Sequence, residues 1–590
     1  MTGADLFVLV TYFVTMLAVG FAFSGQKSCD MYFAGDRQVS WWLGGISFFL
    51  SNLSAFAIVV YSGMGYQYGM VALSIMLLGV PTTLFATTFF ARRWRRTGVI
   101  TPTEFLTTRF SSTTCQVFVW SGILPRVADE GLKIAAIGMF AAGGMQISPN
   151  VSMIVVGLIV MIYSVLGGLW AVIVTELVQF VLLTVTITLL LRLSYHAAGG
   201  WRHFTSNIPQ GFFSPVSGPY TWIFLVSLFV MMSMTQSSNW PLIQKFYSAR
   251  SDREARRVGW FASLITLLIP PIWVLTGMLA RGFLPPNLDP QTVYARLSLT
   301  LLPIGMLGLI VAALFATTMS ALSSGYNVIA SILTVDVYRR LIRPNAPQKE
   351  LVIVGRLLTA MIALVALSLA LAVVHFRWPI FNIMVMVFGL FVPPTVMPVL
   401  AGLLTRRLSA SGALSGYLCG MIVGLGLLAY NLLTAPTDQM TFEAITILIS
   451  FSITTATLAI AAIWFPARGE AAERASRFFA TLTRPSIPTE ISVTNPTPIA
   501  GLVAGAMGVA LIIVALGIFP DTRLNLSTLG IGIVFTVIGL AMILPKWLSK
   551  NSSVPVVPTL KTIEFSDGSH PEGHVPEGNA KLLSQTNRHS

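Results

Sequence analysis

Two membrane-length apolar segments of this chain are each interrupted by a short polar run. The first run, SNLS at residues 51–54, lies within the apolar stretch 41–67, and the second, TQSSN at 235–239, lies within 219–245. Because lipid offers no water to a freed backbone group, a broken helix is tolerated at that depth only where it lines a cavity or is buried in protein. Two such breaks in corresponding positions of two halves are typical of a transporter with its binding site at the membrane midplane.

The composition predicts an all-α integral membrane protein. Hydrophobic residues make up 55% of the 590 residues and charged residues 10%, whereas soluble domains are about one quarter charged. Apolar stretches long enough to cross roughly 30 Å of hydrocarbon recur along the chain, and none shows the alternation of a barrel strand. We expect about fifteen transmembrane helices, at approximately 3–23, 41–67, 69–92, 116–144, 151–170, 172–194, 219–245, 256–284, 303–337, 351–375, 378–403, 411–433, 442–465, 499–519 and 526–547.

The net charge of +14 does not indicate a nucleic-acid partner, because the basic residues gather in alternate loops. The largest groups lie at 92–96, 250–257, 339–343, 406–407 and 468–484. This alternation follows the positive-inside rule. It predicts a multi-pass protein of the plasma membrane, with the N-terminus outside and the C-terminus in the cytoplasm.

The positions of the two breaks predict an internal duplication. If each broken span opens a unit of five helices, the units cover 41–194 and 219–403 and have opposite topology, the inverted-repeat plan of secondary transporters. The remaining parts are an extra helix and loop at 1–40, peripheral helices at 404–548 with a cytoplasmic loop at 467–498, and a disordered cytoplasmic tail at 549–590. The amphipathic start of the cytoplasmic loop is expected to lie on the membrane surface.

Four stretches of the chain resemble the sodium:solute symporter family. They are DMYFAGDRQVSWW from Asp30, RRTGVITPTEFLTTRF from Arg95, SVLGGLWAVIVTELVQF from Ser164 and ATTMSALSSGYNVIASILTVDVY from Ala316, and the resemblance covers about residues 1–465. It implies a LeuT-type fold and sodium-coupled uptake of a small solute such as a sugar, amino acid, carboxylate or vitamin. It implies no enzyme activity and no cofactor, with Na⁺ as the coupling ion and the only metal.

Glu176 is an acid inside an apolar span, which is a functional-site hypothesis by default. It follows Gly167-Gly168, a pair that permits a tight turn between two helices. The family usually has Asp here, and in some members this residue helps to bind a second sodium ion. Because Glu is longer than Asp, it implies an ion site that is displaced from the family's position or a carboxyl group that can be protonated. The alternative is a carboxylate held near the inner interface for structure alone.

The span that begins at Ala316 is rich in hydroxyls, and those of Ser320, Ser323 and Ser324 share one helical face. Sodium prefers oxygen ligands, although small hydroxyl residues also favour close helix packing. By resemblance, the main sodium site consists of the carbonyls of Leu50, Leu53 and Thr317 and the hydroxyl of Ser320, with Ala321 where the family has a second hydroxyl. The second sodium site of some members corresponds to Glu176, Ser320, Ser323 and Ser324.

The expected third core helix carries four charges, Arg126, Asp129, Glu130 and Lys133, near one face. Charges inside a span should face the bundle interior and pair with each other. One interpretation is an ion-pair ladder that holds the helix in the bundle. The other is that Arg126 or Lys133 meets an anionic substrate, since an Arg at a similar place contacts substrate in a carboxylate-transporting member of the family.

Several other polar positions are candidates for the substrate pocket. The sugar-transporting branch of the family has Glu-Gln where this chain has Phe56-Ala57, which argues against a sugar. Each candidate could instead satisfy backbone groups freed by the helix breaks. The full set of expected substrate residues is Ser54, Phe56, Ala57, Thr82, Thr83, Arg126, Gln236, Ser237 and Asn239.

The sequence contains no P-loop, HExxH or CxxC motif, so an ATP-driven pump or a membrane protease has no support. We therefore predict a sodium-coupled symporter for a small polar or anionic organic solute that works by alternating access. The alternatives are a proton-coupled or uncoupled carrier on the same fold, and a membrane sensor or scaffold that does not transport.

Overall fold

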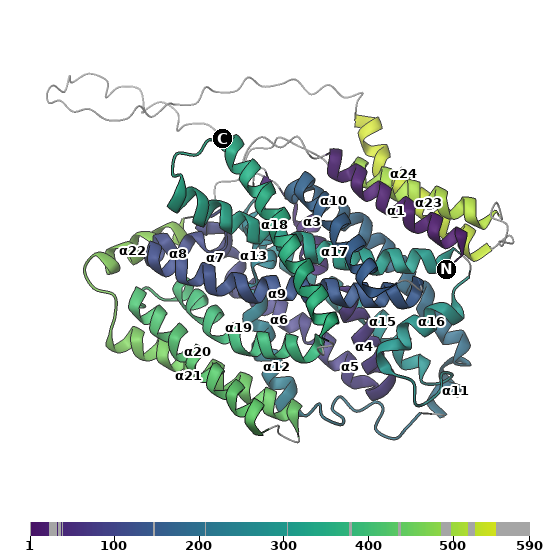
Figure 1. Ribbon diagram of the computed structural model, residues 1–590, viewed down its shortest axis with the longest axis horizontal. Coiled ribbons are helices and arrows are strands. Elements are labelled where there is room, and N and C mark those ends of the chain that lie inside the picture. Colours follow the sequence, from purple (N-terminus) through teal and green to yellow (C-terminus); the bar gives the residue numbers. More distant parts are fainter. Residues whose placement is uncertain are drawn as a thin grey trace, which may run out of the picture. The chain divides into compact units, whose positions relative to one another are not determined.

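One helix, α17 (Met306–Ile332), is buried along nearly its whole length in the computed structural model of the protein. Every residue of it except Leu307 is buried, and it contacts α1, α3, α9, α10 and α18. Its many Ala, Ser, Thr and Gly residues let neighbouring backbones approach closely, as in other membrane bundles. The other core helices therefore pack around α17 (Figure 1).

The structure describes residues 2–22, 32–33, 37, 39–145, 148–206, 208–303, 305–376, 380–434, 438–484, 497–516 and 526–549, and their regular secondary structure is helical. The tail at 550–590 and the loop residues 485–496 lie outside the described residues. The elements are α1 (Gly3–Ala22), α3 (Trp41–Ser51), α4 (Ala55–Tyr68), α5 (Met70–Leu77), α6 (Gly79–Ala86), η2 (Thr87–Ala91), α7 (Arg92–Thr97), α8 (Glu104–Arg109), α9 (Ser112–Met145), α10 (Pro149–Ala197), α11 (Gly200–Ser206), α12 (Trp222–Ser238), α13 (Trp240–Tyr247), α14 (Asp252–Leu268), α15 (Pro270–Ala280), η3 (Pro290–Thr292), α16 (Val293–Leu301), α17, η4 (Leu333–Ile342), α18 (Gln348–His375), α19 (Ile380–Leu404), α20 (Ala410–Thr434), α21 (Gln439–Trp464), α22 (Glu470–Thr483), α23 (Thr497–Ala515) and α24 (Leu526–Ser549).

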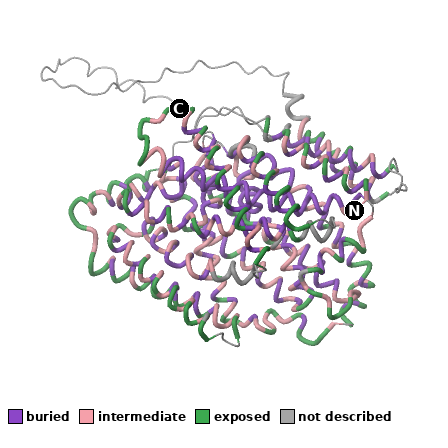
Figure 2. Tube along the Cα trace, in the orientation of Figure 1, coloured by how far each residue is buried: buried purple, intermediate pink, exposed green. Residues whose placement is uncertain are grey.

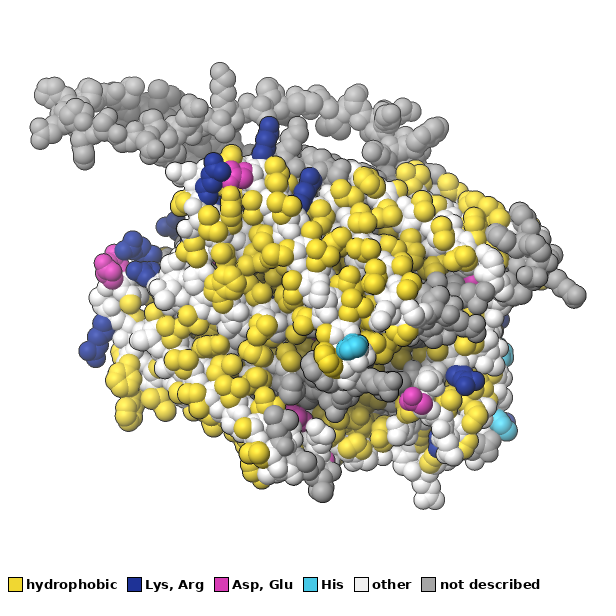
Figure 3. All heavy atoms as spheres, viewed as in Figure 1, with side chains coloured by type: hydrophobic (Ala, Val, Ile, Leu, Met, Phe, Trp, Pro, Cys, Tyr) yellow, Lys and Arg dark blue, Asp and Glu magenta, His cyan; other side chains and the backbone are white. Residues whose placement is uncertain are grey.

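Nine helical stretches of the described chain are long and apolar enough to cross a membrane by themselves, and five shorter apolar helices accompany them. The expected count of about fifteen spans is therefore not confirmed. Of the five shorter helices, two (α3 and α12) belong to the broken spans and three lie in α1, α23 and α24. Helix α9, with four charges between Arg126 and Lys133, is not among the nine. Hydrophobic side chains cover most of the face in Figure 3, and most of its Lys and Arg side chains lie near the upper and left margins.

The first predicted break is confirmed, and the second lies slightly later than expected. Helix α3 ends at Ser51 and α4 begins at Ala55, on either side of Asn52. The second break is at Asn239, whose backbone is extended (φ −61°, ψ 124°), and not at Gln236. Pro241 explains the shift, because proline has no N–H to continue a helix and favours the first turn of a new one.

The two breaks lie side by side. Ser51 and Asn239 line the same cavity, and α3 contacts α13. The carbonyl of Ser237, freed because Pro241 cannot donate to it, accepts a hydrogen bond of 2.9 Å from Trp94 Nε1. This arrangement meets the requirement that irregular backbone at membrane depth be satisfied inside the protein. The division into repeats 41–194 and 219–403 stays a prediction.

The turn expected at Gly167-Gly168 is not seen as a break, because the backbone is assigned as helical throughout α10. An α-helix of 49 residues has a path of about 74 Å at 1.5 Å per residue, more than twice the hydrocarbon thickness of roughly 30 Å. Two parts of α10, residues 149–166 and 172–197, are each apolar enough to span. The expected pair of spans is therefore present without a loop between them.

The amphipathic helix α22 packs its apolar face on protein, and its expected place on the membrane surface stays a prediction. Its buried residues are Ala475, Phe478 and Leu482, and it contacts α7 and α8. The Phe478 ring lies 5.9 Å from that of Phe105, and Arg96 Nη1 donates to the carbonyl of Leu482 at 2.8 Å. The basic segment 92–96 and the residues after it thus cover the apolar face of α22.

Burial falls from the centre of the bundle to its edge, as Figure 2 shows. Helices α20 and α21 expose large apolar side chains such as Leu418, Ile422 and Ile460. Such residues are stable on the outside of a protein whose surroundings are lipid. A cluster of fully buried polar side chains lies where α3, α10, α13 and α17 meet, and it forms the candidate site.

Candidate functional site

The carboxylate of Glu176 is the centre of a buried polar cluster, which we call the Glu176 cluster. Glu176 is fully buried on α10 and accepts hydrogen bonds from hydroxyls of α3 and α17. Its Oε1 lies 2.8 Å from Ser320 Oγ, 3.1 Å from Ser324 Oγ and 3.3 Å from Ser51 Oγ, and its Oε2 accepts from Ser47. A buried carboxylate needs such donors, because desolvation without them is costly.

The structure brings together three of the four residues predicted for the second ion site. Glu176 accepts hydrogen bonds from both Ser320 and Ser324, whereas the Ser323 hydroxyl donates to the carbonyl of Ser320 at 3.0 Å. Glu176 is fully buried inside the bundle. Ser47, which the sequence reasoning missed, is one turn from Ser51 on the first broken helix, and that spacing could have revealed it.

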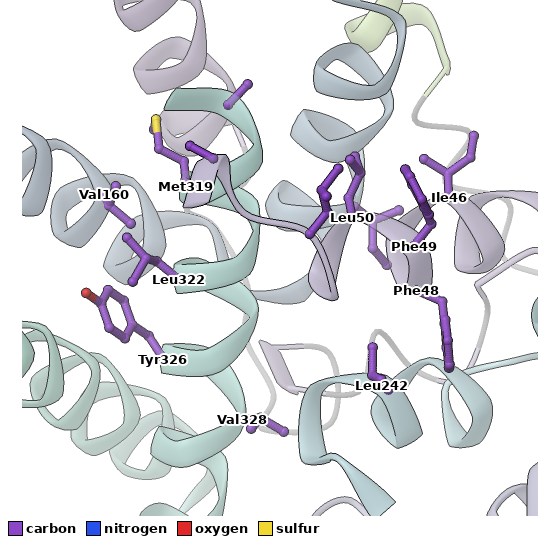
Figure 4. Close-up of a cluster of buried hydrophobic side chains, with 14 of the residues drawn as sticks. Ile46, Phe48, Phe49, Leu50, Val160, Leu242, Met319, Leu322, Tyr326 and Val328 are labelled. Carbon is purple, nitrogen blue, oxygen red and sulfur yellow. The ribbon is translucent and has the colours of Figure 1, made fainter. Parts of the chain in front are cut away.

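The first helix break lies directly against α17. The N–H of Ala55 donates to Thr318 Oγ1 at 3.1 Å, and Ser51 Oγ lies 3.0 Å from Ser324 Oγ. Within the break, the N–H of Leu53 donates to the carbonyl of Leu50 at 3.1 Å. Figure 4 shows Leu50 at the end of α3 and Met319, Leu322 and Tyr326 along α17.

The residues expected at the main sodium site therefore lie on two facing segments. Leu50 and Leu53 flank the break and are buried, and Ala321 is buried on α17. The Thr317 side chain donates to the carbonyl of Leu314 at 2.9 Å, and the Ser320 hydroxyl donates to Glu176. Ser320 thus belongs to both predicted ion sites.

Lys245 is a functional candidate that the sequence reasoning missed. It lies on α13, has a relative exposure of 1%, and its Nζ is 3.4 Å from Ser324 Oγ. An ionisable residue inside a span is a functional candidate in general. The run LIQKFY offered that signal, but Lys245 lies at the predicted end of its span, where a lysine commonly reaches the interface.

A cavity of about 60 Å³, enough for a few water molecules, separates the second break from α9 and α19. Its lining includes Ser51 from the first break and Asn239 from the second, together with all four charges of α9. Thr235 and Ser238 of α12 also line it. Both broken helices and the charged helix therefore meet at one small polar space.

The four charges of α9 are not equivalent. Lys133 Nζ forms salt bridges with Asp129 at 2.8 Å and Glu130 at 3.1 Å. Arg126 makes no salt bridge within the described part of the chain; its guanidinium lies 3.7 Å from the centroid of the Trp240 ring and donates to the carbonyl of Gly122 at 3.2 Å. Lys133 is shared by the two acids, and Arg126, which brings the formal charge of the four residues to zero, is held by a cation–π contact at the cavity wall.

The other predicted substrate residues divide into two groups. Asn239 lines the cavity with Arg126, whereas the hydroxyl of Thr82 donates to the carbonyl of Leu78 at 2.8 Å and that of Ser237 donates to Ser233 at 2.7 Å. Thr82 and Ser237 therefore satisfy their own helices, the alternative that the broken-helix rule allows.

The remaining candidates lie near the breaks without a substrate-like contact. Ser54 and Ala57 are half-buried at the start of α4, and the Phe56 side chain lies outside the described residues. Thr83 and Gln236 are buried, and Gln236 Oε1 has no hydrogen-bond partner. Gln236 is thus the polar side chain of this group with a free acceptor.

Two of the sequence motifs meet just beyond the C-terminal end of α17. Asp336, on the π-helix η4, accepts from Thr101 Oγ1 at 2.5 Å, Thr103 Oγ1 at 2.8 Å and Arg340 Nη1 at 2.8 Å. Arg109 donates to carbonyls that follow α19, including that of Leu408 at 2.8 Å, as suits a cation at a helix C-terminus. The loop at 98–109 therefore connects α9, α19 and the end of α17.

Comparison with known proteins gives one consistent result. A profile of the sodium:solute symporter family matches residues 32–420. The sodium/glucose cotransporter 4 of Danio rerio is 25% identical over 470 residues, covering 72% of this chain and 71% of the relative. The sodium/glucose cotransporter of Vibrio parahaemolyticus is 25% identical over 494 residues, covering 77% and 91%.

A solved structure shows the same fold. The substrate-bound, outward-open state of a Na⁺-coupled sialic acid symporter superposes with a TM-score of 0.70 at 22% identity, covering 79% of this chain and 99% of that one. At this identity the likeness concerns the fold alone. It supports the LeuT-type arrangement of helices that the sequence motifs imply.

Gly325→Ala should destabilise the protein, because the added methyl group would collide with a charged side chain of α9. A methyl group at Gly325 would overlap Glu130 Oε1, which the salt bridge to Lys133 holds in place. We expect a loss of about 1–3 kcal/mol, seen as a lower melting temperature in detergent. Gly426→Ala is the matched control, because nothing lies within 4 Å of that position, and it should be neutral or slightly stabilising.

The shorter side chain of Glu130→Asp should restore part of the stability when it is combined with Gly325→Ala. Equal melting temperatures for Gly325→Ala and Gly426→Ala would show that Glu130 is not confined as described.

Proposed function

The chain belongs to the sodium:solute symporter family, and we propose that it imports a small polar or anionic organic solute by sodium-coupled symport. It is a multi-pass membrane transporter and not an enzyme. The observation that carries the proposal is the position of the first helix break, which lies against the hydroxyl-rich part of α17. Broken helices supply unwound carbonyls, and these coordinate sodium in transporters.

The main sodium site is proposed between the break and α17. Carbonyls of Leu50, Leu53 and Thr317 and the hydroxyl of Ser320 supply the oxygen ligands that a hard cation prefers. Ala321 leaves this set one hydroxyl short of the family pattern, which weakens sodium binding at the site. Sodium bound there joins α3 and α4 to α17, so it favours the state in which the break and α17 are in contact.

Coupling then follows from a difference in affinity between states. Sodium favours the outward-open state, the solute binds beside the two breaks, and rocking of the repeats 41–194 and 219–403 releases both inside. By linkage, sodium and solute must each strengthen the binding of the other by the same factor. The proposed location is the plasma membrane with the N-terminus outside, as the alternating basic loops indicate.

The anionic class of substrate is supported by the charge arrangement of α9. Lys133 is neutralised by Asp129 and Glu130, whereas Arg126 lacks a carboxylate partner within the described residues and lines the cavity. The planar guanidinium suits bidentate binding of a carboxylate. Asn239, on the second break, lies on the same wall to bind a polar group of the solute.

The decisive experiment is uptake into proteoliposomes that contain the purified protein. Purified vesicles should accumulate a labelled monocarboxylate above its outside concentration when an inward sodium gradient is imposed. An equal choline gradient, or a proton gradient alone, should not drive accumulation. Accumulation driven by protons would establish the proton-coupled alternative, and absence of any turnover with a bound solute would establish the sensor.

Two substitutions on α17 should change sodium activation in opposite directions. Ser320→Ala removes a ligand, so the sodium concentration for half-maximal transport should rise about fivefold, since one such contact contributes about 1 kcal/mol. Ala321→Ser adds the missing hydroxyl and should lower that concentration by a similar factor. Maximal rates measured beside the half-maximal concentrations separate these effects from loss of protein; unchanged values in both variants would place the ion elsewhere.

Arg126→Ala should weaken the binding of an anionic solute while the protein stays folded. A charged hydrogen bond contributes about 1.5–3 kcal/mol, so affinity should fall roughly tenfold to a hundredfold. Glu130→Ala is the comparison, because Lys133 keeps its salt bridge to Asp129 while the four charges of α9 are left with one uncompensated positive charge, which should mainly lower the amount of folded protein. If Arg126→Ala loses expression and keeps affinity, the charges of α9 are a structural ladder and the solute is not anionic.

A further inference from the structure

Lys245 carries its ammonium into a part of the bundle that water does not reach. It lies on α13, the helix that begins directly after the break at Asn239. Its relative exposure is 1%, and its chain neighbours Gln244 and Phe246 are fully buried. An ammonium in such a place needs a compensating negative charge, because removing it from water is costly. The question is which group supplies that charge.

Ser324 connects Lys245 to Glu176. Its oxygen lies 3.4 Å from Lys245 Nζ and 3.1 Å from Glu176 Oε1. A hydroxyl has one proton to donate and lone pairs to accept with. Ser324 therefore donates to the carboxylate and accepts from the ammonium, so that one hydroxyl joins the two opposite charges.

The Glu176 cluster has the composition of a cation site. One carboxylate oxygen, Glu176 Oε1, has three hydroxyl oxygens within 3.3 Å, those of Ser51, Ser320 and Ser324. Oxygen ligands of this kind suit sodium. With Lys245 in place, however, the cluster is already neutral, and a sodium ion would meet an ammonium one hydroxyl away.

We propose that Lys245 is a tethered cation that takes the place of a second sodium ion at Glu176. The proposal rests on the proposed sodium coupling at the break between α3 and α4, and it assigns one sodium ion per transport cycle to that site. The second sodium site expected from the resemblance is then filled by the protein itself. Removal of the ammonium should convert the cluster into a working cation site.

Lys245→Met tests the proposal, because methionine is similar in shape and carries no charge. Purified wild-type protein should bind one radioactive sodium ion per chain at saturation, and Lys245→Met should bind two. Sodium should also raise the melting temperature of Lys245→Met more than that of the wild type, because a ligand of the native state stabilises it. Lys245→Arg, which keeps the charge, is the matched control and should bind one ion.

The double variant Glu176→Gln with Lys245→Met removes both charges together and should return the count to one. The double variant is also informative if Lys245→Met leaves Glu176 unpaired and fails to fold. In that case a folded double variant, together with a single variant whose folding is rescued by sodium, supports the proposal. An unfolded single variant that sodium does not rescue overturns it.

The remaining outcomes distinguish the inference from the proposed function. Two sodium ions on the wild type, or one on both the wild type and a folded Lys245→Met, would overturn the inference and leave sodium coupling intact. No sodium on the wild type and one on Lys245→Met would support the tethered cation and reject sodium coupling. No sodium on either would overturn both.

Discussion

A carboxylate without access to water sets the requirements for the centre of this protein. Glu176 is fully buried, and the hydroxyls that satisfy it come from α3 and α17. Those helices must therefore approach α10 closely, which small residues along α17 allow. The break after Ser51 follows from the same arrangement, because Thr318 of α17 accepts the N–H of Ala55 just beyond it. Satisfaction of the buried carboxylate, helix packing and the irregular backbone thus share one set of groups.

At the second break, too, a freed backbone group is satisfied by a residue of another helix, although the cause of the break is different. Pro241 removes a donor, Ser237 loses its helical partner, and Trp94 from α7 supplies the replacement. A break therefore needs a partner outside its own span, and the partner connects it to another helix. Because each break is held by a neighbour that belongs to another segment, movement of the breaks must be coupled to movement of those neighbours.

The sequence predicted the parts of this arrangement that depend on local composition. Polar runs in apolar spans indicated the breaks, and Glu176 and the hydroxyls of Ser320 and Ser324 were identified as members of one site. The second break lies three residues after Gln236, because Pro241, which acts through a missing hydrogen bond, determines its position. Lys245 was missed because its role depends on Ser324, 79 positions away along the chain. The packing of α22 on α7 and α8 likewise depends on tertiary contacts that an amphipathic pattern does not specify, since lipid and protein offer the same apolar surface.

The charges of the interior suggest why one sodium ion suits this chain. In the Glu176 cluster one carboxylate is balanced by Lys245, and in the cavity Lys133 is shared by two acids with Arg126 beside them. Each group is neutral when formal charges are added. An uncompensated charge inside a membrane protein is costly, so a charged solute must enter together with an ion of opposite charge. One sodium ion at the break together with one monoanion at Arg126 adds no net charge to the bundle, whereas a second sodium ion would leave it positive. The same requirement of neutrality that holds Glu176 in place therefore favours joint loading of ion and anion, which is the physical basis of symport.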